Sequence, residues 1–157
     1  MIKAGEKLPE GTLKTLEDGQ VIELTTTQIF SKKRVVIFGV PGAFTPGCSR
    51  NHLPSYVRQY DAIKAKGFDT VACMAVNDVW VMNAWGVSRD AIGKVQMLAD
   101  GSGIYARALG LDSDLSAYGM GLRCKRFSMV VQDGVVESIS VDERAIDLTS
   151  AERTCNL

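Results

Sequence analysis

The sequence predicts an α/β fold built around a mixed β-sheet. Apolar segments of strand length alternate with segments of helical spacing along most of the 157 residues, which is the pattern of strands joined by crossover helices. The chain then closes on two apolar segments separated by Asp133-Gly134, a strong hairpin signal. A length of 157 residues suits one domain with a sizeable core. We therefore expect residues 1–157 to form a single domain.

The first half of the chain predicts a hairpin, a central strand and a helix. The strands of the hairpin cover 11–15 and 21–24, with a turn at Asp18-Gly19 between them. The continuous β-branched run over 35–40 is typical of a strand buried on both faces. Downstream of it, apolar residues recur at spacings of three and four, which predicts a helix that continues to about residue 66.

The second half continues the alternation and adds the closing hairpin. Its expected elements are, in chain order, strand 70–76, helix 79–85, strand 95–99, helix 104–109 and the two hairpin strands 127–132 and 135–139. Strand–helix alternation followed by a terminal hairpin fits a thioredoxin-like fold, with helices on both sides of a mixed central sheet and an N-terminal β-hairpin.

Composition argues against several classes of function. Lys plus Arg and Asp plus Glu both count 18, and no basic run breaks this balance, so no nucleic-acid or membrane-surface partner is expected. No apolar stretch is long enough to span a bilayer. One His and four cysteines without a C-x-x-C pair argue against a metal site. The first residues resemble no targeting signal, so we expect a cytoplasmic protein, or a mitochondrial, plastid or peroxisomal one if a presequence was removed.

Cys48 is the residue best placed for chemistry. It follows the most hydrophobic strand and lies at the start of a helix, where active sites of open α/β sheets form. Free N–H groups and the helix dipole stabilise a thiolate there. The hydroxyl of Thr45, three residues earlier, can reach the sulfur or a substrate oxygen. Most free cysteines are packing residues, and Cys73, inside an apolar strand, is expected to be one of them.

The same segment carries a resemblance to a known family. Pro41-x-x-x-Thr45-x-x-Cys48 matches the active-site signature of peroxiredoxins, and the fuller run over 39–49 is similar to their type II, or class-five, branch. Further similarity extends over most of the chain, through 52–54, 76–78, 98–101 and 125–131. The resemblance implies a thioredoxin fold, a homodimer, and an antioxidant enzyme that reduces hydrogen peroxide and small alkyl hydroperoxides without metal, flavin or haem.

The resemblance also implies a role for each matching residue. Cys48 would attack the distal peroxide oxygen and become a sulfenic acid. Thr45 would orient the peroxide, and Pro41 would shield the sulfenate from water. Arg126 occupies the position of the family's arginine and would stabilise the thiolate and the developing charge. Without the resemblance, an Arg at a strand start is more often a surface residue; its neighbours Arg123 and Lys125 are the competing candidates.

Two further residue types have alternative interpretations. His52, four residues after Cys48, could share its helix face and form a Cys–His hydrolase dyad. Such sites need a third orienting group and an oxyanion motif, which the sequence does not offer, so we expect His52 to be structural or to shape the active-site loop. Trp80 and Trp85 are expected to be core or interface residues.

The sequence does not decide which thiol reduces the sulfenic acid of Cys48, that is, which one is the resolving thiol. The C-terminal resolving position of animal members is Ser150 here, with Cys155 five residues beyond it; Cys73 has the spacing of plant-like members, and Cys124 matches no resolving position. We expect an external thiol first (glutaredoxin with glutathione, or thioredoxin), then Cys155 at a mobile and exposed chain end, then Cys73. A redox sensor that passes its oxidation to a partner, and an inert thioredoxin-like module, are the alternative functions.

Overall fold

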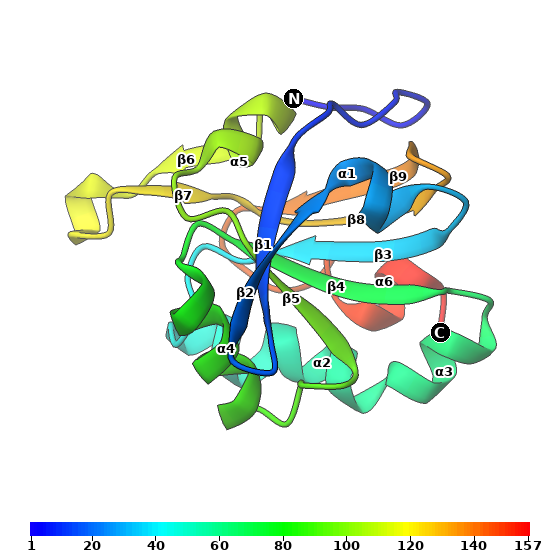
Figure 1. Ribbon diagram of the computed structural model, residues 1–157, viewed down its shortest axis with the longest axis horizontal. Helices are drawn as coiled ribbons and strands as arrows, with labels where there is room; N and C mark the ends of the chain where they lie inside the picture. Colours follow the sequence, from blue (N-terminus) through cyan, green and yellow to red (C-terminus); the bar gives the residue numbers. More distant parts are fainter.

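The computed structural model describes residues 1–157, and a seven-stranded mixed sheet forms its centre (Figure 1). The strands of this sheet are β1 (Thr12–Glu17), β2 (Gln20–Thr25), β3 (Arg34–Gly39), β4 (Thr70–Ala75), β5 (Val95–Ala99), β8 (Arg126–Gln132) and β9 (Val135–Asp142). They lie in the order β2-β1-β5-β4-β3-β8-β9. β4 is parallel to both of its neighbours, β3 and β5, and every other pair of neighbouring strands is antiparallel. The predicted mixed sheet is confirmed.

Helices cover both faces of this sheet. The helical elements of the chain are α1 (Thr26–Phe30), η1 (Cys48–His52), α2 (Leu53–Arg58), α3 (Tyr60–Ala65), α4 (Val79–Ser88), α5 (Ile104–Leu109), η2 (Ser116–Tyr118) and α6 (Ala151–Cys155), of which η2 buries no residue. α2, α3, α4 and α6 lie on one side of the sheet and α1 and α5 on the other (Figure 1). The buried residues of each group belong to a separate apolar cluster. No helix of the structure has the length and apolar character of a membrane span.

The central strands are buried on both sides, as the β-branched runs predict. Along β3, Val36 and Phe38 point into the cluster under α2 and α4, while Val35 and Ile37 point into the cluster under α1 and α5. This alternation follows from the two-residue period of a strand. Full burial of each such side chain contributes about 1.5–3 kcal/mol, so β3 is a rigid support for whatever follows its carboxyl end.

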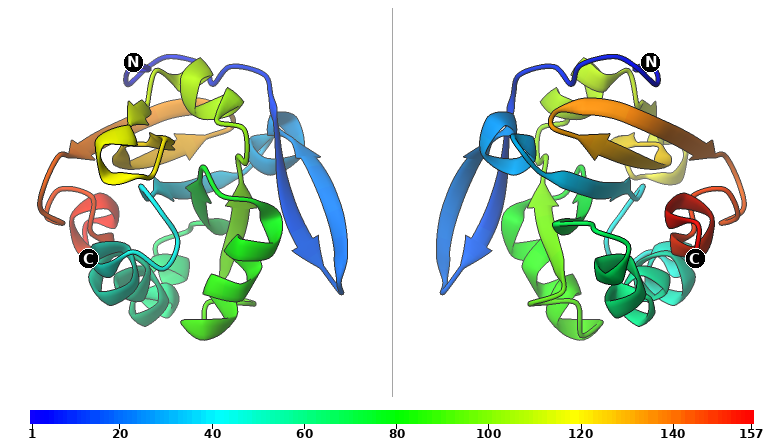
Figure 2. Two further views of the ribbon diagram at one scale, coloured as in Figure 1. Left: turned by 90° about the vertical axis from the view of Figure 1, so that its left-hand side faces the viewer. Right: turned by 90° about the vertical axis from the view of Figure 1, so that its right-hand side faces the viewer.

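The N-terminal hairpin stands partly apart from the rest of the sheet. Its turn at Asp18-Gly19 has positive φ at both residues, 49° and 77°, as a tight two-residue hairpin turn requires. β1 contacts β5 through one bridge, Lys14 to Ala99, and then diverges from it (Figure 2). The hairpin itself is confirmed where the sequence predicts it.

The helix expected up to residue 66 is interrupted. It begins as the π-turn η1, in which the Leu53 amide donates to the Cys48 carbonyl, and it breaks again at Gln59 between α2 and α3. Pro54 has no amide hydrogen and lies in the first turn of α2, where such a residue is tolerated. The sequence analysis does not predict α1, α6 or the two-stranded ribbon of β6 (Asp112–Asp114) and β7 (Leu122–Cys124). These elements are too short to show a periodic pattern of apolar residues.

Candidate active site

Cys48 opens η1, directly beyond the carboxyl end of β3, and only 1% of it is exposed. Two hydrogen bonds hold the loop around it against neighbouring elements. The Ala43 amide donates to Asn77 Oδ1 at 3.0 Å, beyond the end of β4, and Trp85 Nε1 of α4 donates to Ser49 Oγ at 2.9 Å. The sulfur therefore sits on a segment fixed from two sides, at the sheet edge where the sequence places the chemistry.

Arg126 reaches Cys48 from the first position of β8. This strand pairs with β3, which brings its amino end beside the active-site loop. Arg126 Nη2 donates to Cys48 Sγ at 3.2 Å, and the guanidinium is only partly exposed. The guanidinium therefore supplies a fixed positive charge and a hydrogen-bond donor to the sulfur.

The two competing cations lie elsewhere. Arg123 Nε donates to the Met120 carbonyl at 2.9 Å, and its Nη1 lies 3.2 Å from where a Cβ on Gly42 would be, at the far end of the loop from Cys48. Lys125 is exposed. Of the three cations in this stretch, Arg126 is therefore the one that contacts the sulfur.

His52 holds the other side of the Arg126 guanidinium. Arg126 Nη1 lies 2.9 Å from His52 Nδ1, and His52 Nε2 lies 3.0 Å from the Thr149 carbonyl. A carbonyl only accepts and a guanidinium only donates, so the His52 proton must be on Nε2. Burial, and then the Arg126 charge, lower the pKa of His52 to about 3, against the opposing effects of the Thr149 hydrogen bond and Asp142. His52 is neutral and its free lone pair faces Arg126, so a Cys–His dyad is excluded and the loop-shaping interpretation agrees with the geometry.

Thr45 and Pro41 belong to the same loop but make no hydrogen bond to the sulfur. Thr45 Oγ1 donates to the Gly42 carbonyl at 2.6 Å, which uses its only hydrogen and leaves its lone pairs as acceptors. Pro41 is partly buried, at the start of the loop. Phe44, between them, has φ of 64° and is 54% exposed. Its left-handed backbone is unusual for an aromatic residue, and no feature of the sequence announced it.

The remaining thiols are buried and unpaired, and no disulfide is present. Burial raises the pKa of Cys73 well above its usual range, which agrees with a core thiol. Cys124 donates to the Val40 carbonyl at 3.1 Å, and burial raises its pKa to about 12. The expectation of a mobile, exposed Cys155 is wrong: α6 packs this residue into the core at 4% exposure, and burial raises its pKa to about 12.

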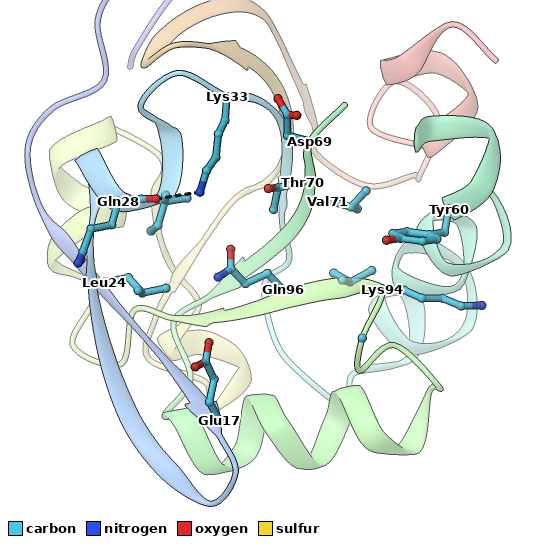
Figure 3. Close-up of a pocket in the computed structure, with 13 residues that line it drawn as sticks. Glu17, Leu24, Gln28, Lys33, Tyr60, Asp69, Thr70, Val71, Lys94 and Gln96 are labelled. Carbon is cyan, nitrogen blue, oxygen red and sulfur yellow. Dashed lines mark hydrogen bonds between the residues drawn. The ribbon is translucent and has the colours of Figure 1, made fainter. Parts of the chain in front are cut away.

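A separate cavity of about 370 Å³ lies at the opposite edge of the sheet (Figure 3). It is lined by residues at the amino ends of β4 and β5, among them Thr70 and Val95, together with Lys33, Tyr60 and Lys94. It contains no thiol, and Cys48 lies beyond the carboxyl end of β3. This cavity is therefore not part of the candidate site.

Comparisons with known proteins agree with this arrangement. The chain matches the Redoxin family over residues 3–154. It is 38% identical over 158 residues to "Peroxiredoxin-2E-2, chloroplastic" of Oryza sativa subsp. japonica, covering 96% of this chain and 69% of that protein. It is 38% identical over 146 residues to "Peroxiredoxin-2E, chloroplastic" of Arabidopsis thaliana, covering 90% of this chain and 62% of that one. The chain thus spans about two thirds of the length of these relatives.

A solved structure matches along nearly its whole length. Reduced Prx3 from Vibrio vulnificus in complex with H2O2 superposes with a TM-score of 0.93 at 41% sequence identity, covering 98% of this chain and 96% of that chain. The match of family, sequence and fold coincides with a buried cysteine held by an arginine at the end of a central strand. The chain therefore belongs to the peroxiredoxins, a family of thiol-dependent peroxidases, and its resemblance is to their type II branch.

Proposed function

We propose that Cys48 is the nucleophile with which this chain reduces hydroperoxides, and that Arg126, Thr45 and Pro41 assist it within one domain, residues 1–157. The observation that carries the proposal is the 3.2 Å contact between Arg126 Nη2 and Cys48 Sγ in an almost fully buried site. A donor fixed before the substrate arrives costs no reorganisation during the reaction. Among the four thiols, only Cys48 has a cation within hydrogen-bond distance.

The chemistry follows from the positions of these groups. The Cys48 thiolate attacks the distal oxygen of the hydroperoxide, so that an S–O bond forms while the O–O bond breaks. The departing oxygen takes a proton and leaves as water or an alcohol, and Cys48 is left as a sulfenic acid. Arg126 stabilises the charge on the oxygens. Thr45, whose hydrogen is given to Gly42, accepts the hydroperoxide O–H, and Pro41 limits access of water.

Regeneration is proposed to use an external thiol. The thiolate is the attacking species in disulfide exchange, and burial disfavours that form at both Cys73 and Cys155. Ser150 occupies the C-terminal resolving position and N-caps α6 through Arg153 N. Glutaredoxin with glutathione, or thioredoxin, is the proposed reductant, with the cytoplasm as the proposed compartment and the plastid as the alternative suggested by relatives named chloroplastic.

A homodimer is proposed, chiefly from the resemblance to type II members. Phe44, Trp80 and Tyr118 are 54%, 64% and 79% exposed, and an interface that covered such large apolar groups would remove them from water. The loop that carries Phe44 is hydrogen-bonded, through the Ala43 amide, to Asn77, which lies three residues before Trp80. Light scattering should give a dimer mass that falls to the monomer mass in Trp80→Glu; monomer alone in the parent protein at high concentration would contradict the dimer.

Trapping the sulfenic acid tests the peroxidase assignment. Reduced protein is treated with one equivalent of H2O2 and a sulfenic-acid-specific reagent, and mass spectrometry then locates the label. We expect the label on Cys48 and none on Cys73, Cys124 or Cys155. Sustained consumption of hydroperoxide with a thiol reductant indicates a peroxidase. Consumption of only one equivalent of hydroperoxide per Cys48 indicates the alternative, a redox sensor. Label on another cysteine would refute the role of Cys48.

A further inference from the structure

The loop that follows β9 is held by a single carboxylate. Asp142 Oδ2 accepts from the amides of Asp147 at 3.0 Å and Thr149 at 2.9 Å and from Thr149 Oγ1 at 2.8 Å, and Oδ1 accepts from the Leu148 amide at 3.3 Å. Although partial burial opposes ionisation, these hydrogen bonds keep the pKa of Asp142 below its usual value. The charged carboxylate thus fixes the backbone of Thr149.

The Thr149 carbonyl is the point where this loop meets the active site. It accepts from His52 Nε2 at 3.0 Å and from Tyr56 Oη at 2.8 Å. Thr149 and His52 are both fully buried, so no water can replace the carbonyl as the partner of Nε2. The proton of His52 is held on Nε2, and Nδ1 is left as the acceptor that meets Arg126 Nη1 at 2.9 Å.

In each of these contacts, one group can only donate or can only accept the hydrogen bond, which fixes the role of the other group. We propose that Asp142 is a positioning residue for Cys48: it fixes the Thr149 carbonyl, which sets the His52 tautomer, which orients Arg126 toward the sulfur. Asp142 is the register partner of Arg126 across β8 and β9, but its carboxylate bonds residues 147–149 and makes no ion pair with the guanidinium. The inference rests on the proposed roles of Cys48 and Arg126, and it extends the functional machinery to a loop at the edge strand of the sheet.

A double-mutant cycle tests this role. The rate constant for oxidation of Cys48 by H2O2 is measured in the parent protein, Asp142→Ala, Arg126→Ala and the double variant. Misplacing a catalytic donor by a fraction of an ångström is costly, so we expect Asp142→Ala to lower the rate about tenfold. In the Arg126→Ala background the same change should lower the rate less than about twofold, because the group that it positions is gone.

The matched control is Asp69→Ala. Asp69 Oδ2 also accepts a backbone hydrogen bond, from the Arg34 amide at 2.8 Å, but at the far end of the sheet. This variant should keep the parent rate. If Asp142→Ala fails to fold, Thr149→Val takes its place in the cycle, since it removes only the Oγ1 contact with Asp142; the expected loss is then about twofold to threefold.

The His52 tautomer gives an independent readout, because the chain contains one histidine. Nitrogen-15 NMR of the imidazole should show the Nε2–H form alone in the parent protein and in Asp69→Ala, and a mixture of tautomers in Asp142→Ala. Equal fold losses with and without Arg126, or an unchanged rate and tautomer in Asp142→Ala, would overturn the inference. Failure of the proposed function is separate, since it would appear as sulfenic acid on a residue other than Cys48.

Discussion

Cys48 and Cys73 are equally hidden from solvent and yet differ in the groups that surround the sulfur. Both belong to the same apolar cluster, with exposed fractions of 1% and 0%. Cys73 pairs in register with Phe38 and Met97 in the middle of the sheet, and its thiol has no hydrogen-bond partner. Cys48 lies one loop beyond the end of the neighbouring strand β3, at the start of η1 and 3.2 Å from the Arg126 guanidinium. Burial alone therefore does not set the chemistry of a thiol here.

What separates them is whether the fold supplies a charge to the buried sulfur. A buried anion without a partner is strongly disfavoured, whereas the same anion beside a fixed cation is not. At Cys73, burial is the largest effect, followed by the Cys48 and Cys124 thiols, and together they raise the pKa of the thiol against the opposing effect of the Arg126 charge. At Cys48, β8 delivers Arg126 because it pairs with β3, and His52 holds the guanidinium from the other side. Each of the following experiments removes one part of that difference.

Removing the sulfur of Cys48 should have the largest effect. Cys48→Ser is expected to abolish peroxide turnover and keep the fold, because a neutral hydroxyl is a far weaker nucleophile than a thiolate. Cys124→Ser is the matched control: it makes the same replacement at a buried thiol whose contact with the Val40 carbonyl a serine can reproduce. Steady-state peroxide consumption should be near that of the parent protein in the control. Turnover above a few per cent in Cys48→Ser would contradict the assignment.

Removing the charge beside Cys48 should have the next largest effect. Arg126→Ala is expected to lower the second-order rate with H2O2 on the order of 10²-fold, the usual loss for one charge-assisted donor. Arg123→Ala removes a cation of equal charge that bonds Met120 instead, and it should lower the rate severalfold at most. Stopped-flow measurement of both variants decides between them. A large loss in Arg123→Ala with little change in Arg126→Ala would reverse the two roles.

Much of the sheet could be predicted from the sequence, because its strands are long apolar runs with clear turns. β3, β4, β5 and the two hairpins lie within a few residues of the predicted positions. α6 could not be predicted: its five residues have no visible period, and only Ser150 as N-cap marks its start. The wrong expectation for Cys155 follows from that omission, since nothing local shows that a chain end packs against the sheet.

The candidate site also has a part that could be predicted from the sequence and a part that could not. Cys48 and Thr45 lie in one short segment, so their proximity is a local property that a motif can carry. The contact between Arg126 and Cys48 joins residues 78 positions apart, and that between His52 and Thr149 joins residues 97 apart. Such pairs depend on strand register, and residue types alone do not give it. For Arg126 only the family resemblance supplied the position.

The neutral form of His52 should be visible as a pH dependence of stability. The unfolded chain takes up a proton near pH 6.5, while the folded chain holds the pKa at about 3. The unfolded state then binds more protons below pH 6.5, so the free energy of unfolding falls as the pH falls. Between pH 7 and 5 the expected loss is about 2 kcal/mol. Urea titrations should show this loss in the parent protein and not in His52→Asn; equal losses in both would contradict the pKa assignment.

The smallest effect is expected at the remaining sulfurs of the core that Cys48 shares. Cys73→Ser and Cys155→Ser should each retain turnover with glutathione plus glutaredoxin, because the thiolate of either residue is disfavoured by burial. Cys155 is the more accessible of the two, since α6 is a helix of five residues outside the sheet and such a short element opens locally at less cost than a central strand. Cys73 could reach Cys48 only if central β4 left its pairing with both β3 and β5. The order external thiol, Cys155, Cys73 therefore stands as the prediction. Loss of turnover in Cys73→Ser alone, together with a Cys48–Cys73 disulfide in non-reducing peptide maps of the parent protein, would show that the active-site region unfolds far more readily than its packing implies.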